Sequence, residues 1–451
     1  MVRYWRRRIS WGLVFLASLI ACIVLHSRFS GQTDRLAVAV EIPPIASSAQ
    51  VQLVQQGIAS YQSGNFTEAI AFFSQALSQT PSAKERAAVH SNLALAYRQI
   101  GQLPEAIAHW QQAIEIYQRQ DDETSRHQVP KLLTEQAQAY NDLGQNRRAM
   151  KILQFTVELA KQNPDLQTQA ATLGALGNAY WTVGDYEQAL LSHQASLTLA
   201  RQLNAPEYIA SSLNNLANLY ISRSQRYRYQ ASIAKIEGDD RENTRLIELA
   251  EREMSAARSA FEESLQETQA VGGIARLKTL LNLNHLLEQL PSPDWTAIAR
   301  NGEQALELVA TLPDSRDKAY VLINLAEQLL KVGRANPSAN LQPSTLLAQA
   351  LAVARTIGDT RAQSFALGSL GQIYQSAGQT PAAMEFMQQA QLAAGQANAP
   401  DSAYRWQWQA GRLLKATGKT KEAIASYEQA IATLQSIRSN LLAINKDLQF
   451  D

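Results

Sequence analysis

Asparagine is the residue type whose placement in this 451-residue chain most clearly suggests a recognition chemistry. Asparagine repeatedly occupies the same two register positions of the predicted helices. The first position holds Asn92, Asn215, Asn282 and Asn324, and the second holds Asn178 and Asn218. An asparagine side chain carries both a hydrogen-bond donor and an acceptor. A row of them can therefore hold an extended peptide backbone without reading its side chains. The same side chains could instead bridge neighbouring helices, because buried polar groups need partners in any case.

The sequence lacks the patterns that are typical of catalysis. It contains neither the glycine-rich loops that cradle phosphates nor the His-Glu-x-x-His pattern of zinc peptidases. None of the six histidines stands at metal-ligand spacing: His26, His90, His109, His127, His193 and His285. We interpret His193 as a packing residue. Cys22 is the single cysteine, which excludes an internal disulfide and a cysteine-based zinc cluster. We expect no enzyme activity, no cofactor and no metal site.

The charge balance bears on the class of partner. Lysine and arginine total 41 and aspartate and glutamate total 40, so the formal net charge is +1. A general nucleic-acid binder needs a basic face, which this composition does not favour. Beyond the first fifty residues there is no convincing alternation of polar and β-branched apolar residues. The sequence therefore predicts an all-α protein whose partner is a protein or peptide and not a nucleic acid.

A repeated pattern must position these residues. A small residue is followed three positions later by Tyr or Leu, then by a turn glycine, then by an Ala-x3-bulky-x2-Ala run. Clear copies begin at Leu176-Gly177 and at Leu370-Gly371. The run places its residues on one helical stripe, and the small residue lets the second helix approach closely. Each copy thus predicts a pair of antiparallel helices.

This pattern resembles the tetratricopeptide repeat, and the resemblance covers residues 51–434 in about nine copies. It implies a right-handed superhelical solenoid with a concave groove for peptides or proteins. The repeat alanines at 69, 106, 149 and 189 are about 40 residues apart and so exceed the usual period of about 34. Longer units of this kind are similar to those of kinesin light chains and bacterial signalling proteins.

The same resemblance implies a set of groove residues. In the subclass that clamps a carboxylate, two asparagines cooperate with lysines. Asn178, Asn215 and Lys278 match part of that clamp, whereas Gly174 stands where a lysine would be needed. The full predicted peptide-binding set is Asn92, Asn178, Asn214, Asn215, Asn218, Lys278, Asn282 and Asn324.

A charged insertion interrupts the fifth copy at about residues 221–250. Gly238-Asp239-Asp240 is typical of a turn between two helical runs. We predict that both helices of this unit extend into a hairpin that projects from the solenoid. Mixed charge on a helix surface favours a solvated spacer. The alternative is that the projecting hairpin binds a partner.

The first 25 residues predict a membrane segment. Four arginines within the first eight residues precede an uncharged apolar run from Ile9 to Leu25, near the lower limit of ~17 residues for crossing a bilayer. The arginines favour a cytoplasmic N-terminus, with the repeats on the periplasmic side. Three fates stay open: an uncleaved anchor, a lipoprotein modified at Cys22, or a cleaved and secreted form. Residues 26–50 are polar and predict a linker.

The C-terminal stretch, residues 435–451, predicts a helical tail. With the end of the last repeat it is similar to the junction in cyanobacterial proteins that join tetratricopeptide repeats to a caspase-like CHAT peptidase domain. The His and Cys dyad of that peptidase has no counterpart here. Two functions follow: a non-catalytic, membrane-tethered scaffold that binds partners in its groove, or the substrate-recruiting half of a split system whose CHAT-type peptidase is encoded elsewhere.

Overall fold

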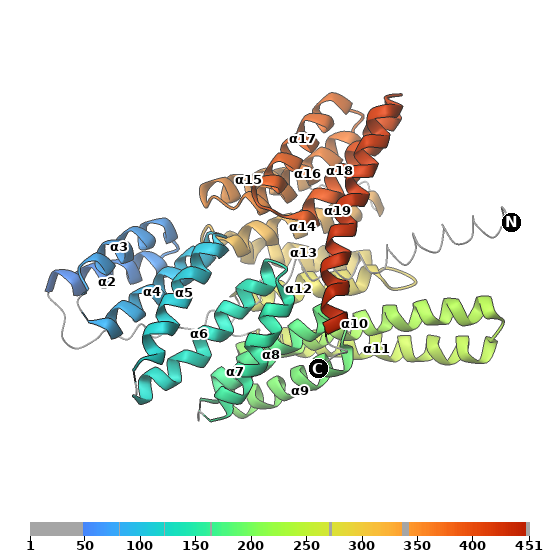
Figure 1. The fold of residues 1–451 in the computed structure, drawn as a ribbon. Helices are drawn as coiled ribbons and strands as arrows, with labels where there is room; N and C mark the ends of the chain where they lie inside the picture. The colour runs from blue at the N-terminus through green and yellow to red at the C-terminus, as the bar shows by residue number, and fades with distance from the viewer. Residues whose placement is uncertain are drawn as a thin grey trace.

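A computed structural model describes residues 48–80, 82–120, 122–162, 165–269, 273–335 and 342–447. Within these residues the chain forms eighteen helices and no strand (Figure 1). The helices are α2 (Ser48–Gln62), α3 (Phe66–Ser78), α4 (Ala83–Gln99), α5 (Leu103–Gln118), α6 (Glu123–Asp142), α7 (Asn146–Lys161), α8 (Leu166–Val183), α9 (Tyr186–Gln202), α10 (Pro206–Glu237), α11 (Asp240–Glu267), α12 (Gly273–Glu288), α13 (Trp295–Ala310), α14 (Arg316–Ala335), α15 (Pro343–Thr356), α16 (Thr360–Ser376), α17 (Thr380–Gln396), α18 (Pro400–Ala416) and α19 (Thr420–Asp447).

These helices pair into hairpins that stack along the chain. Each hairpin begins with an even-numbered helix, here called an A helix, and ends with an odd-numbered B helix. Every helix packs on the next, and from α6 to α18 each A helix also contacts the following A helix, as α6 contacts α8 and α10 contacts α12. The A helices therefore form one layer and the B helices the other. This all-α solenoid of helical hairpins is the fold class that the sequence predicts.

Small residues on the A helices bring the two helices of a hairpin together. A Cβ atom built on Gly177 of α8 would lie 2.6 Å from the ring of His193 on α9. The same collision would occur between Gly371 and Met387 and between Gly411 and Tyr427. His193 is fully buried, which confirms that it is a packing residue.

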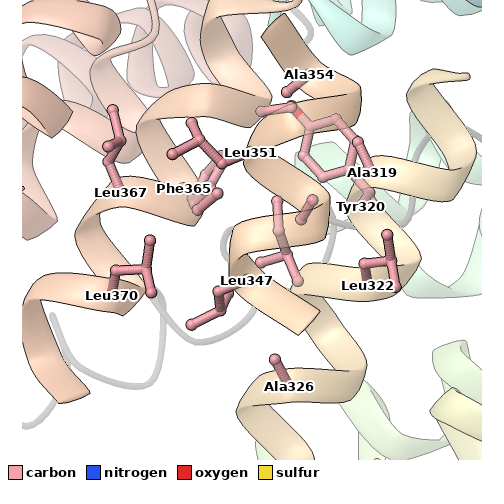
Figure 2. Close-up of a cluster of buried hydrophobic side chains, with 14 of the residues drawn as sticks. Ala319, Tyr320, Leu322, Ala326, Leu347, Leu351, Ala354, Phe365, Leu367 and Leu370 are labelled. Atoms are coloured by element: carbon pink, nitrogen blue, oxygen red, sulfur yellow. The ribbon is translucent and has the colours of Figure 1, made fainter. Parts of the chain in front are cut away.

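Hydroxyl groups join several hairpins to the next one along the chain. Ser264 of α11 donates to the carbonyl of Ala210 on α10, and its oxygen lies 2.9 Å from that of Thr279 on α12. Ser196 makes the equivalent contacts one unit earlier. Apolar side chains fill the remaining space: Figure 2 shows Tyr320 of α14 close to Phe365 of α16, and both are buried. Clusters of buried apolar side chains thus follow one another through the stacked units.

The α10–α11 hairpin is longer than its neighbours and extends beyond them (Figure 1). Gly238 ends α10 with a φ of 83°, and the side chain of Asp239 caps α11 by accepting from the Glu242 amide. A small cluster built around Ala231, Ala234 and Leu246 joins the two helices in the projecting part. The extension is therefore packed along its length.

Two contacts join units that are distant in sequence. Helix α4 contacts α14, and α19 reaches back from the last unit to α8. In Figure 1, α19 crosses the molecule toward the α10–α11 hairpin. The solenoid thus folds back on itself.

The predicted membrane segment at 1–25, including Cys22, lies outside the described residues, as do residues 26–47 of the predicted linker. Helix α2 already begins at Ser48. Across the ranges given above, no helix combines the length and the apolar character that crossing a bilayer requires.

Candidate functional site

All eight predicted groove residues lie on A helices. They come from five helices of one layer: Asn92 from α4, Asn178 from α8, Asn214, Asn215 and Asn218 from α10, Lys278 and Asn282 from α12, and Asn324 from α14. This common layer places the set along one wall of the solenoid. Their individual surroundings differ in burial and in hydrogen bonding.

Two of the asparagines bind each other. Asn282 Nδ2 donates to Asn214 Oδ1 at 3.0 Å, and each residue is 2% exposed. The two residues are separated by 68 positions and join α10 to α12. This pair therefore links consecutive A helices, as bridging asparagines would.

Three more asparagines are almost covered. Asn92, Asn215 and Asn324 are between 5% and 6% exposed. They share one register position and lie on three different A helices. Only a small edge of each reaches the surface, so a ligand would meet at most part of the amide group.

Asn178 and Asn218 are the more accessible members of the set. Both are half-buried and occupy equivalent positions on α8 and α10, two A helices that contact each other. Asn178 Oδ1 is buried and has no hydrogen-bond partner. A buried acceptor without a partner is costly, and such groups commonly mark a place where a ligand or water belongs.

Lys278 does not stand next to an open carboxylate-binding position. Its Nζ lies 3.4 Å from Asp317 Oδ2, and its side chain is 12% exposed. Gly174, which replaces a clamp lysine, lies on α8 beside Ser196. The structure thus places Lys278 in a link between α12 and α14.

Sequence reasoning missed a second amide network, which joins α12 and α14 of the A-helix layer to the B helix α13. Asn284 Nδ2 donates to Gln328 Oε1 at 3.2 Å, and Asn301 donates to Asn284 Oδ1 at 2.8 Å. Gln328 in turn donates to the carbonyl of Leu281. Glutamine is abundant throughout this sequence, so no spacing in the chain distinguishes Gln328 from the exposed glutamines.

A histidine pair lies in the second hairpin. The Nδ1 atoms of His90 and His109 are 2.8 Å apart, and the His109 ring stacks on Tyr97 with centroids 5.4 Å apart. Burial, then the neighbouring His109, lowers the pKa of His90 from 6.5 to about 4. Burial also lowers the pKa of His109. Both rings are therefore neutral near pH 7, where one Nδ1 donates to the other.

Metal-binding geometry does not occur in the described part of the chain, where no group of three or more His, Cys, Asp or Glu side chains could hold an ion. The chemistry of the A-helix layer is that of amide groups and ion pairs. Amide groups can both donate to and accept from a polar backbone.

Comparison with known families identifies the repeats. Tetratricopeptide repeat models match residues 48–119, 85–162, 172–207 and 406–432. These segments contain tetratricopeptide repeats, as the sequence pattern predicts. A curated relative, Protein KINESIN LIGHT CHAIN-RELATED 1 of Arabidopsis thaliana, is 30% identical over 142 residues. That match covers 30% of this chain and 23% of the relative, so the chain spans about a quarter of that protein's length.

Solved structures show weaker similarity. A Rap protein complexed with Competence and Sporulation Factor is 15% identical, with a TM-score of 0.47, over 69% of this chain and 76% of that chain. Aspartyl phosphate phosphatase F from Bacillus subtilis is 18% identical, with a TM-score of 0.43, over 68% and 70%. Neither similarity identifies a ligand for this chain.

Proposed function

We propose that this chain is a non-catalytic scaffold that binds an extended protein or peptide segment along its A-helix layer. In this proposal the A helices line the concave side of a right-handed superhelix. The observation that supports it best is the half-buried pair Asn178 and Asn218 on adjacent A helices, the most accessible asparagines of the predicted set.

The chemistry of this pair suits a peptide backbone. An asparagine Oδ1 accepts from a backbone N–H, and its Nδ2 donates to a backbone carbonyl. Two such groups on neighbouring helices could hold successive peptide units of one strand. Asn214 and Asn282, which bind each other, would support the wall from behind.

The test is affinity capture with the part of the chain from Ala46 to Asp451. The double variant Asn178→Ala, Asn218→Ala should capture its partners about tenfold less well, because each lost hydrogen bond contributes roughly 0.5–1.5 kcal/mol. Gln112→Ala is the matched control, since it removes an exposed amide from α5 in the B layer. Equal capture by the double variant and the control would remove the assignment to this layer.

We further propose that residues 1–25 tether the scaffold to a membrane with the repeats on the periplasmic side. The basic start and the apolar run of the sequence support this topology. A reporter fused at Asp451 that is active only in the cytoplasm would overturn it.

The alternative function, in which this chain works with a separate CHAT-type peptidase, rests on the C-terminal resemblance alone. It predicts a peptidase of that type in a neighbouring reading frame. If no neighbouring reading frame encodes such a peptidase, this alternative is removed.

A further inference from the structure

The first three hairpins meet the seventh and eighth hairpins edge to edge. The turns that follow α2, α4 and α6 lie against the segments that precede α14 and α16. Gly64, in the first of these turns, has no room for a side chain because Pro313 lies against it. Gly101, in the second, faces the carboxylate of Asp359 in the same way. Both glycines have a positive φ, which L side chains rarely adopt.

One part of this junction is apolar and small. Phe66 and Ile100 from the first two hairpins form a buried cluster with Ile357, the residue that directly follows α15. Tyr61 and Tyr97 pack around it. By comparison, the core cluster that includes α14 to α16 contains many more buried side chains. The apolar contribution at the junction is therefore modest.

The other part is a buried ionic cluster. Arg316 Nη1 lies 2.9 Å from Asp142 Oδ2, across 174 positions of sequence. Arg361 donates through Nη1 to the carbonyl of Asp142 at 3.3 Å and through Nη2 to Asp401 at 2.6 Å. One residue, Asp142, thus receives a guanidinium group from α14 and another from α16.

The hydrogen bonding of this cluster is incomplete. Asp142 Oδ1, Asp359 Oδ2 and Arg361 Nε are buried atoms without a hydrogen-bond partner, and so is the nearby Tyr320 hydroxyl oxygen. Desolvating charges offsets much of their attraction, and unfilled hydrogen bonds add to the cost. Such a contact restricts the two surfaces to one mutual orientation but adds little net stability.

We propose that this junction is a reversible latch that closes the solenoid. Each hairpin contacts mainly its neighbours, so small rotations shared among the intervening units can separate the two edges without unfolding any hairpin. With the latch closed, the edges of successive superhelical turns are joined and the A-helix layer is enclosed. Opening the latch admits a ligand to that layer, a consequence that rests on the proposed function.

The latch can be tested by distance measurement without any ligand. Spin labels at Ser78 and Glu303, both exposed on B helices on either side of the junction, are placed in the full chain with Cys22→Ser. Arg316→Gln should raise the ratio of long to short distances about tenfold, because it removes the guanidinium that binds the buried Asp142 carboxylate and leaves only Arg361, which is shared with Asp401. Asp142→Asn, which keeps the side-chain shape, should act in the same direction. Helix content by circular dichroism should stay unchanged.

Arg201→Gln is the matched control, since it breaks an exposed Arg–Glu pair with Glu263 away from the junction. Unchanged distance distributions in both junction variants would overturn the latch. So would loss of helix content in both, because the junction would then be part of the folding core. Because no ligand is present, either outcome leaves the assignment of Asn178 and Asn218 to be decided by capture alone.

Discussion

At the residue scale, polar side chains on the A-helix layer divide into those with partners and those without. Asn214 and Asn282 satisfy each other, whereas Asn178 retains a buried acceptor without a partner. Asparagine type and register alone do not separate these cases. Whether an asparagine has a partner depends on contacts between residues far apart in the chain, such as Asn214 and Asn282, which are 68 positions apart.

The histidine pair of the second hairpin predicts a pH-dependent stability. The pKa of His90 is about 4 in the folded chain and 6.5 ordinarily. Between these two pH values, His90 binds a proton in the unfolded chain but not in the folded chain. The free energy of unfolding should therefore fall as the pH drops from 6.5 to 4. Thermal unfolding of His90→Asn should depend less steeply on pH in this window. His127→Asn is the control, and identical pH slopes for all three proteins would contradict the prediction.

At the element scale, the hairpin is the unit that the sequence predicts best. The small residue, the turn glycine and the alanine run are all local signals, and in the clear copies at Gly177 and Gly371 the structure places them as the pattern requires. Gly184 ends α8 with a φ of 85°, and Asp185 caps α9 by accepting from the Gln188 amide. Such signals need no information from distant parts of the chain.

Close approach within a hairpin gives a prediction for glycine replacement. Gly177→Ala should destabilise the protein by about 1–3 kcal/mol, since the new Cβ would collide with the buried ring of His193. Gly395→Ala is the matched control, because that glycine is exposed in α17 with no atom within 4 Å of an added Cβ. It should be neutral or stabilising by up to about 1 kcal/mol. Chemical denaturation measures both, and equal effects would refute the packing argument.

At the scale of the whole molecule, the solenoid combines neighbour contacts with two long-range contacts, the junction and the approach of α19 to α8. The neighbour contacts could be predicted from the repeats. The junction could not, because Asp142, Arg316 and Arg361 resemble ordinary surface charges in the sequence, and Asp142 on α6 meets the other two only after the three hairpins from α8 to α13 have accumulated their rotations. For the same reason the burial of most predicted groove asparagines was not predictable.

A local disturbance should therefore stay local. Trp406 is 2% exposed and donates to Ser364 at 3.0 Å, so Trp406→Ala should cost about 3–5 kcal/mol. We expect hydrogen exchange to accelerate in α16 to α19 while α5 to α9 keep their protection. Trp408→Ala, two residues on and 42% exposed, is the control. Uniform acceleration along the chain would show that the units unfold as one.

The long hairpin restricts how related chains can vary. Its two helices meet through Tyr227, Ala231 and Ala234 on one side and Leu246 and Leu249 on the other, at alternating intervals of three and four residues. Adding one residue to either helix would rotate the residues beyond it by about 100° about the helix axis. Their apolar side chains would then no longer face the other helix. Natural length variants of the arm should consequently differ by matched blocks of about seven residues in each helix, so that the arm grows or shrinks in discrete steps.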